Sequence, residues 1–225
     1  MKMILNDGFI RVDAVEASDL SVVNAARVSF GKLETEMDER NKGLIAFLMR
    51  ERHGSPFEHN MFRFHVRVPI FVAREWMRHR AGWSYNEYSA RYTVMDDDGY
   101  VPDVQDVRAQ VGKPGAYTFE PLSREVAITA METIEESIGH SYRTYNYLLK
   151  LGVAKELARS VLPVGMYTEF FATCNARSLM HFISLRAAET AQHEIRVVAK
   201  ELEAIFAEHM PVTAQAFTDC GRMSP

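Results

Sequence analysis

The stretch that decides the fold is Met61-Phe62-Arg63-Phe64-His65-Val66-Arg67-Val68, in which apolar and polar side chains alternate without interruption. Successive side chains of a β-strand point to opposite faces, so this period of two is typical of a strand. The two phenylalanines and two valines share one face, and the two arginines and the histidine share the other. We therefore predict a strand at 61–68 with one apolar face and one basic face.

Helical spacing of apolar side chains dominates the rest of the chain. Strand and helix patterns do not alternate regularly, which favours the α+β class. We expect a mixed sheet flanked by long helices, in a single compact domain over 1–225 that assembles as an oligomer. The segment 95–119 is rich in aspartate, glycine and proline and is predicted to be a mobile loop. The other predicted strands are 9–15 and 166–174, and the predicted helices are 18–26, 38–52, 70–80, 123–152, 155–162, 177–186 and 189–209.

The composition narrows the class of protein. The chain has 225 residues, 47% of them hydrophobic, which is enough for a substantial core. Its 26 basic and 30 acidic residues give a net charge of -4, which offers no general attraction to nucleic acid or anionic membrane. No apolar run approaches the roughly 20 residues that span a bilayer, and the start MKMILNDGF is too soon polar for a signal peptide. These features predict a soluble, cytoplasmic protein.

Several common catalytic motifs are absent. The chain has neither GxGxxG nor GxxxxGK[ST], so side chains must supply most contacts to any bound nucleotide. The pair His193-Glu194 does not continue as HExxH, because residue 197 is valine. His53, His59 and His65 match no metal motif, and the only cysteines, Cys174 and Cys220, form no CxxC. We predict no metal site and no disulfide.

Arginine is concentrated in the first half of the chain. Residues 50–92 contain eight arginines, four histidines and four glutamates but no lysine. Arginine without lysine favours bidentate recognition of phosphate or carboxylate over a diffuse positive surface. The alternative is a set of solvated helix faces with ordinary salt bridges.

Residues 78–92, RHRAGWSYNEYSARY, gather the strongest hydrogen-bonding groups of this region. Arg78 and Arg80 point in different directions at a helix end, so they can serve two anions, or one anion and one ring. Glu87 supplies an acceptor for a ribose hydroxyl or an imide N–H. Ser89 has two interpretations, as a nucleophile or as a residue that positions the substrate by a hydrogen bond. The second is favoured because no lysine or histidine follows at a spacing that would activate the hydroxyl.

These residues resemble the flavin-dependent thymidylate synthases, whose hallmark is Arg-His-Arg, a spacer and then serine. Three further blocks are similar to the family and stand in its order: AARVSF at 25–30, HGSPFEH at 53–59, and NARSLM at 175–180 continuing to Leu185-Arg186. The resemblance covers nearly the whole chain apart from 95–119. Four ordered blocks are far more specific than the Arg-His-Arg triplet alone.

The resemblance implies a reductive methylation of dUMP to dTMP by a homotetramer with active sites between subunits. Methylenetetrahydrofolate would supply the one-carbon unit and NADPH would reduce bound FAD, with no enzyme cysteine involved. Arg186 would lie by the uracil ring and favour its ionised form. The implied FAD ligands are Ser55, Arg78, His79, Arg80 and Glu87, with Asn175, Arg177 and His181 from another subunit. The implied dUMP ligands are Glu75, Arg78, Glu87, Tyr88, Ser89, Ala90, Arg91, Arg159 and Arg186.

The chain departs from the family pattern at three places. The spacer from Arg80 to Ser89 has eight residues, one more than the family's. We expect the additional residue to lie between Ala81 and Tyr85 and to be absorbed by a bulge at Gly82-Trp83, because glycine tolerates unusual backbone angles. The alternative is that the helix end shifts, which would turn Glu87 and Ser89 away from dUMP. Residue 75 is glutamate where glutamine is expected, and residue 55 is serine where threonine is frequent.

Two other functions are compatible with an arginine-rich chain. A nucleic-acid-binding module would be basic, and the pI near 6.1 argues against it. Another flavoenzyme or nucleotide-binding protein built on the same scaffold is the second alternative.

Overall fold

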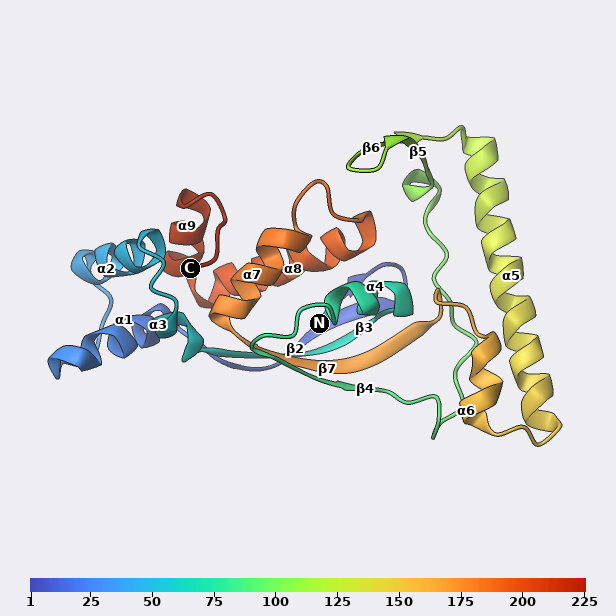
Figure 1. Cartoon of the computed structure of the whole chain (residues 1–225), viewed down its shortest axis with the longest axis horizontal. Coiled ribbons are helices and arrows are strands. Elements are labelled where there is room, and N and C mark those ends of the chain that lie inside the picture. The colour runs from blue at the N-terminus through green and yellow to red at the C-terminus, as the bar shows by residue number, and fades with distance from the viewer.

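The fold is organised around a five-stranded sheet, seen edge-on in the computed structural model, which describes all 225 residues (Figure 1). The strands are β1 (Lys2–Ile4), β2 (Gly8–Glu16), β3 (Met61–Pro69), β4 (Trp83–Glu87) and β7 (Tyr167–Asn175), in the order β1-β2-β3-β7-β4. The α+β class is confirmed. All four neighbouring pairs are antiparallel, so the strand directions alternate throughout rather than being mixed.

The central strand β3 is the strand predicted from its alternating pattern. Phe62, Phe64, Val66 and Val68 are fully buried on one face of the sheet. β3 pairs with β7 over nine residues, from Met61 opposite Asn175 to Pro69 opposite Tyr167. Burial of one complete face fixes this register, because a shift by one residue would turn every apolar side chain to solvent.

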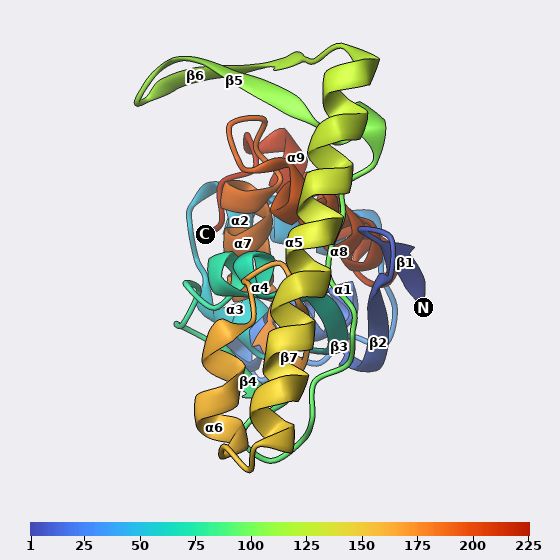
Figure 2. The same cartoon turned by 90° about the vertical axis from the view of Figure 1, so that its right-hand side faces the viewer.

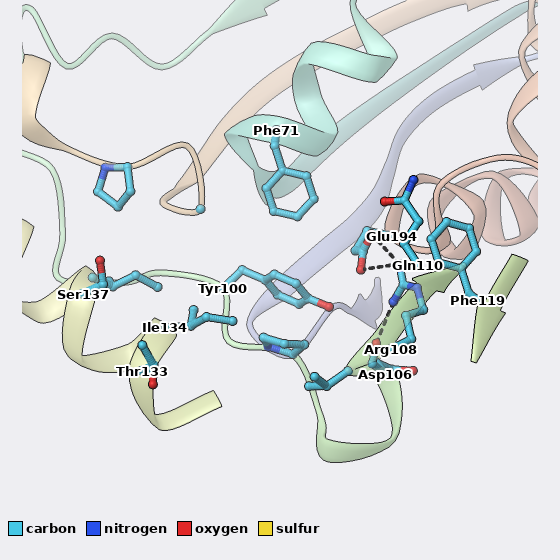
Figure 3. Close-up of a pocket in the computed structure, with 15 residues that line it drawn as sticks. Phe71, Tyr100, Asp106, Arg108, Gln110, Phe119, Thr133, Ile134, Ser137 and Glu194 are labelled. Atoms are coloured by element: carbon cyan, nitrogen blue, oxygen red, sulfur yellow. Dashed lines mark hydrogen bonds and ion pairs between the residues drawn. The ribbon is translucent and has the colours of Figure 1, made fainter. Parts of the chain in front are cut away.

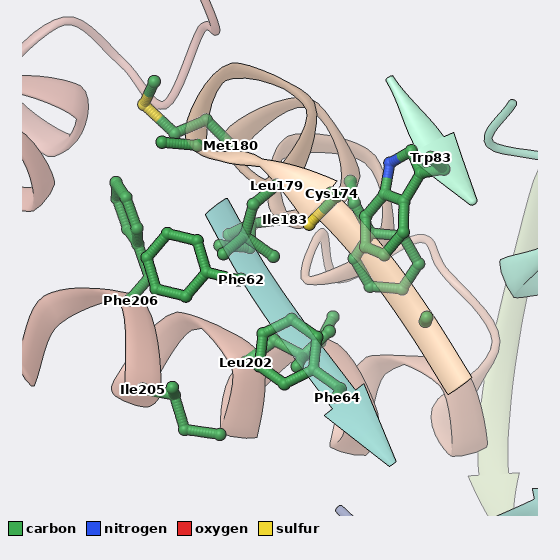
Figure 4. Packing of buried hydrophobic residues seen from close by; sticks show 14 of the residues in the cluster. Phe62, Phe64, Trp83, Cys174, Leu179, Met180, Ile183, Leu202, Ile205 and Phe206 are labelled. Atoms are coloured by element: carbon green, nitrogen blue, oxygen red, sulfur yellow. The ribbon is translucent and has the colours of Figure 1, made fainter. Parts of the chain in front are cut away.

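Helices cover the apolar face of the sheet (Figure 1). α4 (Ile70–Trp76), α7 (Ala176–Arg186) and α8 (His193–His209) lie over its middle. Figure 4 shows side chains of β3, α7 and α8 interleaving in the core, which comprises 33 buried residues. At one end of the sheet lie α1 (Asp19–Arg27), the 3₁₀ helix η1 (Val28–Phe30), α2 (Glu39–Arg50), α3 (Ser55–Glu58) and α9 (Pro211–Asp219).

The opposite face of the sheet carries a charged network and no covering helix (Figure 1). Nη2 of Arg11 lies 2.8 Å from Nδ1 of His65, and Nε2 of His65 lies 3.1 Å from a carboxylate oxygen of Glu169. The ring of His65 stacks on Phe171 at 4.8 Å, and Phe171 remains 40% exposed. The predicted basic face is therefore a mixed-charge face with an exposed aromatic ring.

A long helix, α5 (Arg124–Lys150), stands beside the body of the molecule (Figures 1 and 2). Ser123 caps its first turn by accepting a hydrogen bond from the backbone N–H of Val126. The chain turns back at Gly152, which has a φ of +83°, as the sequence predicted. α6 (Lys155–Ala158) and the 3₁₀ helix η3 (Arg159–Val161) follow and pack with α5 around a second small core at Met95, Tyr145 and Ala158.

The segment predicted to be a loop contains a β-hairpin, and this corrects the sequence analysis. After the 3₁₀ helix η2 (Val104–Asp106), β5 (Arg108–Lys113) pairs with β6 (Ala116–Pro121). The hairpin extends from the top of α5 (Figure 2). Nearly all of its residues are exposed, so no buried face imposed the alternation by which strands are recognised.

Other differences from the predicted elements are local. The helix after Pro69 ends at Trp76 instead of residue 80, and the helix predicted from 189 begins at His193. β1, β4 and α9 were not predicted. No helix combines the length and the apolar composition that crossing a membrane requires.

Candidate functional site

The Arg78-His79-Arg80 triplet and the end of α7 meet at one cavity. The triplet follows the C-terminal end of α4, and the hydroxyl of Tyr85 on β4 donates a 2.7 Å hydrogen bond to the carbonyl of His79. The cavity has a volume of about 500 Å³. Its lining consists of Arg78, His79, Arg80, Ala81, Trp83, His181, Leu185 and Arg186.

Arg186 is fixed at this cavity by three contacts. Its Nε donates to Nε2 of His79 at 3.0 Å, and its Nη2 donates to the backbone carbonyl of Glu75 at 3.1 Å. Its Nη1 forms a salt bridge with the carboxylate of Glu75. The structure thus brings Arg186 to Glu75 and His79, two predicted site residues that precede it by more than 100 positions in the sequence.

His79 is neutral in this environment. The residue is 7% exposed, and burial together with the unfavourable electrostatic effect of Arg186 and His181 lowers the pKa of its ring to about 4. Arginine can only donate, so Nε2 must accept and the remaining proton lies on Nδ1. At neutral pH His79 therefore acts as a fixed hydrogen-bond acceptor for Arg186.

A second cavity of about 740 Å³ adjoins the first, since Ala81 and His181 line both. Asn175 and Arg177 contribute to it from the start of α7. Asn175 caps α7 through a 2.8 Å bond from the N–H of Ser178, and Arg177 forms a 2.6 Å salt bridge with Glu58. The sequence analysis placed Asn175, Arg177 and His181 in another subunit from Arg78–Arg80, whereas a single chain brings both groups to adjoining cavities.

The other residues of this region differ in how they are engaged. Ser55 begins α3 next to Gly54, where a Cβ would lie 2.6 Å from Nε of Arg177. Arg78 and Arg80 have side chains without any hydrogen bond or salt bridge to the rest of the chain. Unpaired guanidinium groups at a cavity are suited to bind an oxyanion.

The remaining predicted residues form a separate group near α6 and the second core. Glu87 accepts a 2.8 Å hydrogen bond from Thr168, and Oγ of Ser89 accepts a 3.1 Å bond from Nε of Arg91. Arg159 lies in η3, and its Nε donates to the carbonyl of Glu156 at 3.4 Å. Tyr88 donates to the carbonyl of Val94, and Ala90 packs against the second core. None of these residues lines the cavity of Arg186.

The turn before β4 accommodates the longer spacer. The N–H of Trp83 bonds to the carbonyl of Arg80 at 3.2 Å, Gly82 has a φ of +69°, and β4 then pairs with β7 residue for residue. The chain thus makes a tight turn through a left-handed Gly82, at the position where the bulge was predicted, and the ladder of β4 with β7 is regular. Tyr85 and Glu87 share the sheet face on which α4 lies, so Glu87 is on the same side of the sheet as Arg78.

Replacing Gly82 with alanine is expected to destabilise the fold by more than the about 1–2 kcal/mol that a left-handed backbone costs a non-glycine residue. The added Cβ would lie 2.1 Å from Oγ of Ser178, which must then move. Gly152→Ala is the matched control, because Gly152 also has a positive φ of +83° but no neighbouring atom within 4 Å. Equal midpoints of urea unfolding for the two variants would contradict a close contact between the added Cβ and Ser178.

Both cysteines lie away from the cavities. Cys174 faces the core beside Trp83 (Figure 4), and burial raises the pKa of its thiol well above the usual value. Cys220 follows the last helix, α9.

The double substitution of both cysteines with alanine is expected to retain substantial turnover, because a buried protonated thiol is a poor nucleophile. Loss of all turnover in a folded double variant would identify a cysteine nucleophile instead.

A third cavity, of about 630 Å³, lies between α5, α4 and the hairpin (Figure 3). Its walls include Phe71, Tyr100 and Ile134 and a salt bridge of 3.2 Å between Arg108 and Glu194. No residue that the sequence analysis assigned to a site lines it. No group of three or more histidine, cysteine, aspartate or glutamate side chains is arranged to hold a metal ion.

The structure adds site residues that the sequence analysis did not identify. Trp83 and Leu185 line the cavity of Arg186, Tyr85 supports His79, and Thr168 holds Glu87. All four neighbour predicted residues along the chain or across the β4–β7 ladder. The missing signal was the pairing of β4 with β7, which one sequence does not reveal.

Comparison with known proteins identifies the family of this chain. Residues 12–212 match the model of the family described as thymidylate synthase complementing protein. A flavin-dependent thymidylate synthase from Streptomyces coelicolor is 48% identical over 93% of this chain and 90% of its own, and one from Thermosipho africanus is 46% identical over 95% and 92%. The crystal structure of a UMP/dUMP methylase, PolB, from Streptomyces cacaoi bound with 5-Br dUMP superposes with a TM-score of 0.91 at 44% identity, covering 97% of this chain and 98% of that one. The chain therefore belongs to the thymidylate synthase complementing family, whose relatives are the flavin-dependent thymidylate synthases.

Proposed function

We propose that this chain is a flavin-dependent thymidylate synthase that methylates dUMP to dTMP, with FAD, methylenetetrahydrofolate and NADPH. The observation that carries the proposal is the arginine cavity, in which Arg186 is held in place by Glu75 and His79 beside the unpaired Arg78 and Arg80. We also propose that residues 1–225 work as one domain and that the protein acts in the cytoplasm.

The residues of the two adjoining cavities fit FAD. The free guanidinium groups of Arg78 and Arg80 suit a pyrophosphate, and His181 lies at the junction of the two cavities. Asn175 and Arg177 line the second cavity, and Ser55 follows Gly54, which lies against Arg177; these residues would bind the rest of the cofactor. When bound, FAD supplies the hydride that completes the methyl group.

Arg186 would stabilise negative charge on the uracil ring. An arginine has five N–H donors, and three of those on Arg186 are engaged by His79 and Glu75. The two that remain can face a ring oxygen or an ionised ring nitrogen. Such a preorganised donor favours the charged form of the ring without reorganising during the reaction.

The group formed by Glu87, Ser89, Arg91 and Arg159 would bind the sugar and phosphate of dUMP. Arg91 and Arg159 supply donors for the phosphate, and Ser89 would position the nucleotide as a hydrogen bonder. The hydroxyl of Ser89 contacts Arg91, whose guanidinium cannot accept a proton, and no histidine, lysine or carboxylate, which supports this role over that of a nucleophile.

These two groups of residues motivate a homotetramer with active sites between subunits. Trp83 and Glu87 are separated by about 13 Å along β4, at about 3.3 Å per residue, and only Trp83 lines the cavity of Arg186. A nucleotide that needs both groups would therefore be bound by one group from each of two chains. The uncovered sheet face, the hairpin and the exposed side of α5 provide surface for such contacts.

The purified protein is expected to be a yellow tetramer, or to become yellow when FAD is added. Light scattering coupled to size-exclusion chromatography measures the mass, and the visible absorption band of the flavin measures occupancy. An active monomer would contradict active sites shared between subunits.

The proposed reaction is tested by dUMP-dependent oxidation of NADPH in the presence of methylenetetrahydrofolate, with dTMP quantified by chromatography. Omitting dUMP or the folate should abolish dTMP formation. A flavin-loaded protein that oxidises NADPH but forms no dTMP would support another flavoenzyme on the same scaffold. A protein that binds no flavin but binds nucleic acid would support the nucleic-acid module.

UMP is a second candidate substrate. The related PolB structure is also known bound with 5-Br UMP, and it superposes on this chain with a TM-score of 0.89 at 45% identity. The same assay with UMP in place of dUMP distinguishes the two. A higher kcat/KM for UMP would reassign the substrate and leave the chemistry unchanged.

A further inference from the structure

Glu75 is the residue that most clearly departs from the family pattern and has a defined role in the structure. It lies on the last turn of α4, and both its carboxylate and its backbone carbonyl contact the guanidinium of Arg186. The carboxylate side chain is 40% exposed, and that of Arg186 is 21% exposed. The pair is therefore shielded from water mainly on the arginine's side.

The charges at the cavity explain why Arg186 needs such a partner. Three arginines, Arg78, Arg80 and Arg186, line the same cavity, and no aspartate or glutamate is among the lining residues. Like charges that line one cavity repel one another. Glu75 supplies the carboxylate that pairs with Arg186 and offsets its charge.

The orientation of Arg186 follows from its acceptors. His79 is neutral and accepts from Nε, while the two acceptors of Glu75 engage Nη1 and Nη2. Oε2 and the backbone oxygen of Glu75, together with Nε2 of His79, are used on one guanidinium, which leaves Oε1 as the free acceptor of the carboxylate. A carboxylate engaged in this way has less capacity for a nucleotide of its own, and its negative charge would oppose ionisation of a nearby uracil.

We propose that Glu75 is a positioning residue that acts on the reaction only through Arg186 and does not itself bind the nucleotide. This inference rests on the proposed function. It reassigns Glu75 from the group of dUMP ligands to the support of the arginine. Glutamine at this position would still offer an oxygen to Nη1, so hydrogen bonding and charge can be separated by substitution.

The experiment is a double-mutant cycle on the flavin-loaded protein with Glu75→Ala, Glu75→Gln, Arg186→Ala and the double variant Glu75→Ala/Arg186→Ala. Turnover, the KM for dUMP and the dissociation constant of dUMP by calorimetry are measured for each. Glu75→Ala is expected to lower kcat by about 10- to 100-fold, because a misplaced catalytic group costs about this much. Its flavin content should be unchanged, and Glu75→Gln should recover most of the loss.

The cycle separates a positioning role from a direct contact. If Glu75 acts only through Arg186, the double variant is no worse than Arg186→Ala, both in turnover and in dUMP affinity. If the double variant loses as much activity as the product of the two single losses, Glu75 contacts the nucleotide itself. If Glu75→Ala has wild-type kinetics, Arg186 needs no support. Either result overturns the inference. Should Glu75→Ala fail to fold, the same cycle is run with Glu75→Leu and Glu75→Leu/Arg186→Ala, because leucine offers no side-chain acceptor to Arg186. A wild-type protein that forms no dTMP would instead overturn the proposed function.

Discussion

Replacing Arg186 with alanine is expected to lower the rate of dTMP formation by about 10²–10³-fold, the loss typical of removing one preorganised donor from a developing negative charge. The flavin should remain bound, because Arg78 and Arg80 are free to hold it and do not depend on Arg186. The removed side chain is the one member of the cavity with both its position and its orientation fixed by other residues. Rapid mixing of the reduced, flavin-loaded variant with dUMP and methylenetetrahydrofolate measures the rate of dTMP formation directly.

The control for this prediction is Arg50→Ala, which removes an exposed arginine that pairs with Glu51. An exposed pair of this kind contributes about 0–1 kcal/mol to stability and nothing to turnover. If Arg186→Ala behaves like Arg50→Ala and forms dTMP at a near-normal rate, Arg186 does not act on the pyrimidine.

Replacing Trp76 with alanine is expected to lower the free energy of unfolding by about 3–5 kcal/mol, the range for truncating a large buried aromatic side chain. The ring is completely buried and lies 6.0 Å from Trp83, 5.4 Å from Phe170 and 5.0 Å from Phe182 between ring centroids. Phe182 in turn lies 4.8 Å from the ring of His79. The variant should therefore lose order at the arginine cavity as well as stability, and chemical denaturation and flavin affinity measure the two effects.

Trp76→Phe is the matched variant for this position. The indole Nε1 of Trp76 is buried and has no hydrogen-bond partner, so phenylalanine removes an unsatisfied donor while keeping an aromatic ring. It should therefore cost clearly less than Trp76→Ala, because the space left empty in the core is smaller. An equal loss for both variants would show that Nε1 makes a stabilising interaction.

The sequence predicted the helices and strands in which buried apolar side chains recur at a regular spacing. β3 was predicted because its whole apolar face is buried, and α5 because one stripe of it packs and a glycine ends it. The exposed hairpin and the short edge strand β4 carry no such pattern. The residues of β4 were interpreted as ligands on a turn, although they form a strand that pairs with β7.

The candidate site was predicted as a set of residues but not as an arrangement. From the sequence, Asn175, Arg177 and His181 were expected to come from another subunit than Arg78–Arg80, and no contact of Arg186 within the chain was predicted. In the structure β7 lies between β3 and β4, and α7 follows β7 directly, so the chain itself carries Arg186 to the end of α4. Such long-range pairings depend on contacts between remote segments, for which a single sequence gives no periodic signal.

The two tryptophans of the chain are neighbours, at 6.0 Å between ring centroids, and Trp83 lines the cavity assigned to the flavin. All indole fluorescence of the protein therefore originates beside that cavity. An isoalloxazine absorbs in the range where indole emits, so a flavin bound there quenches this emission by energy transfer over a short distance. The intensity at the tryptophan wavelength is consequently a built-in optical readout of cofactor occupancy, available without any label.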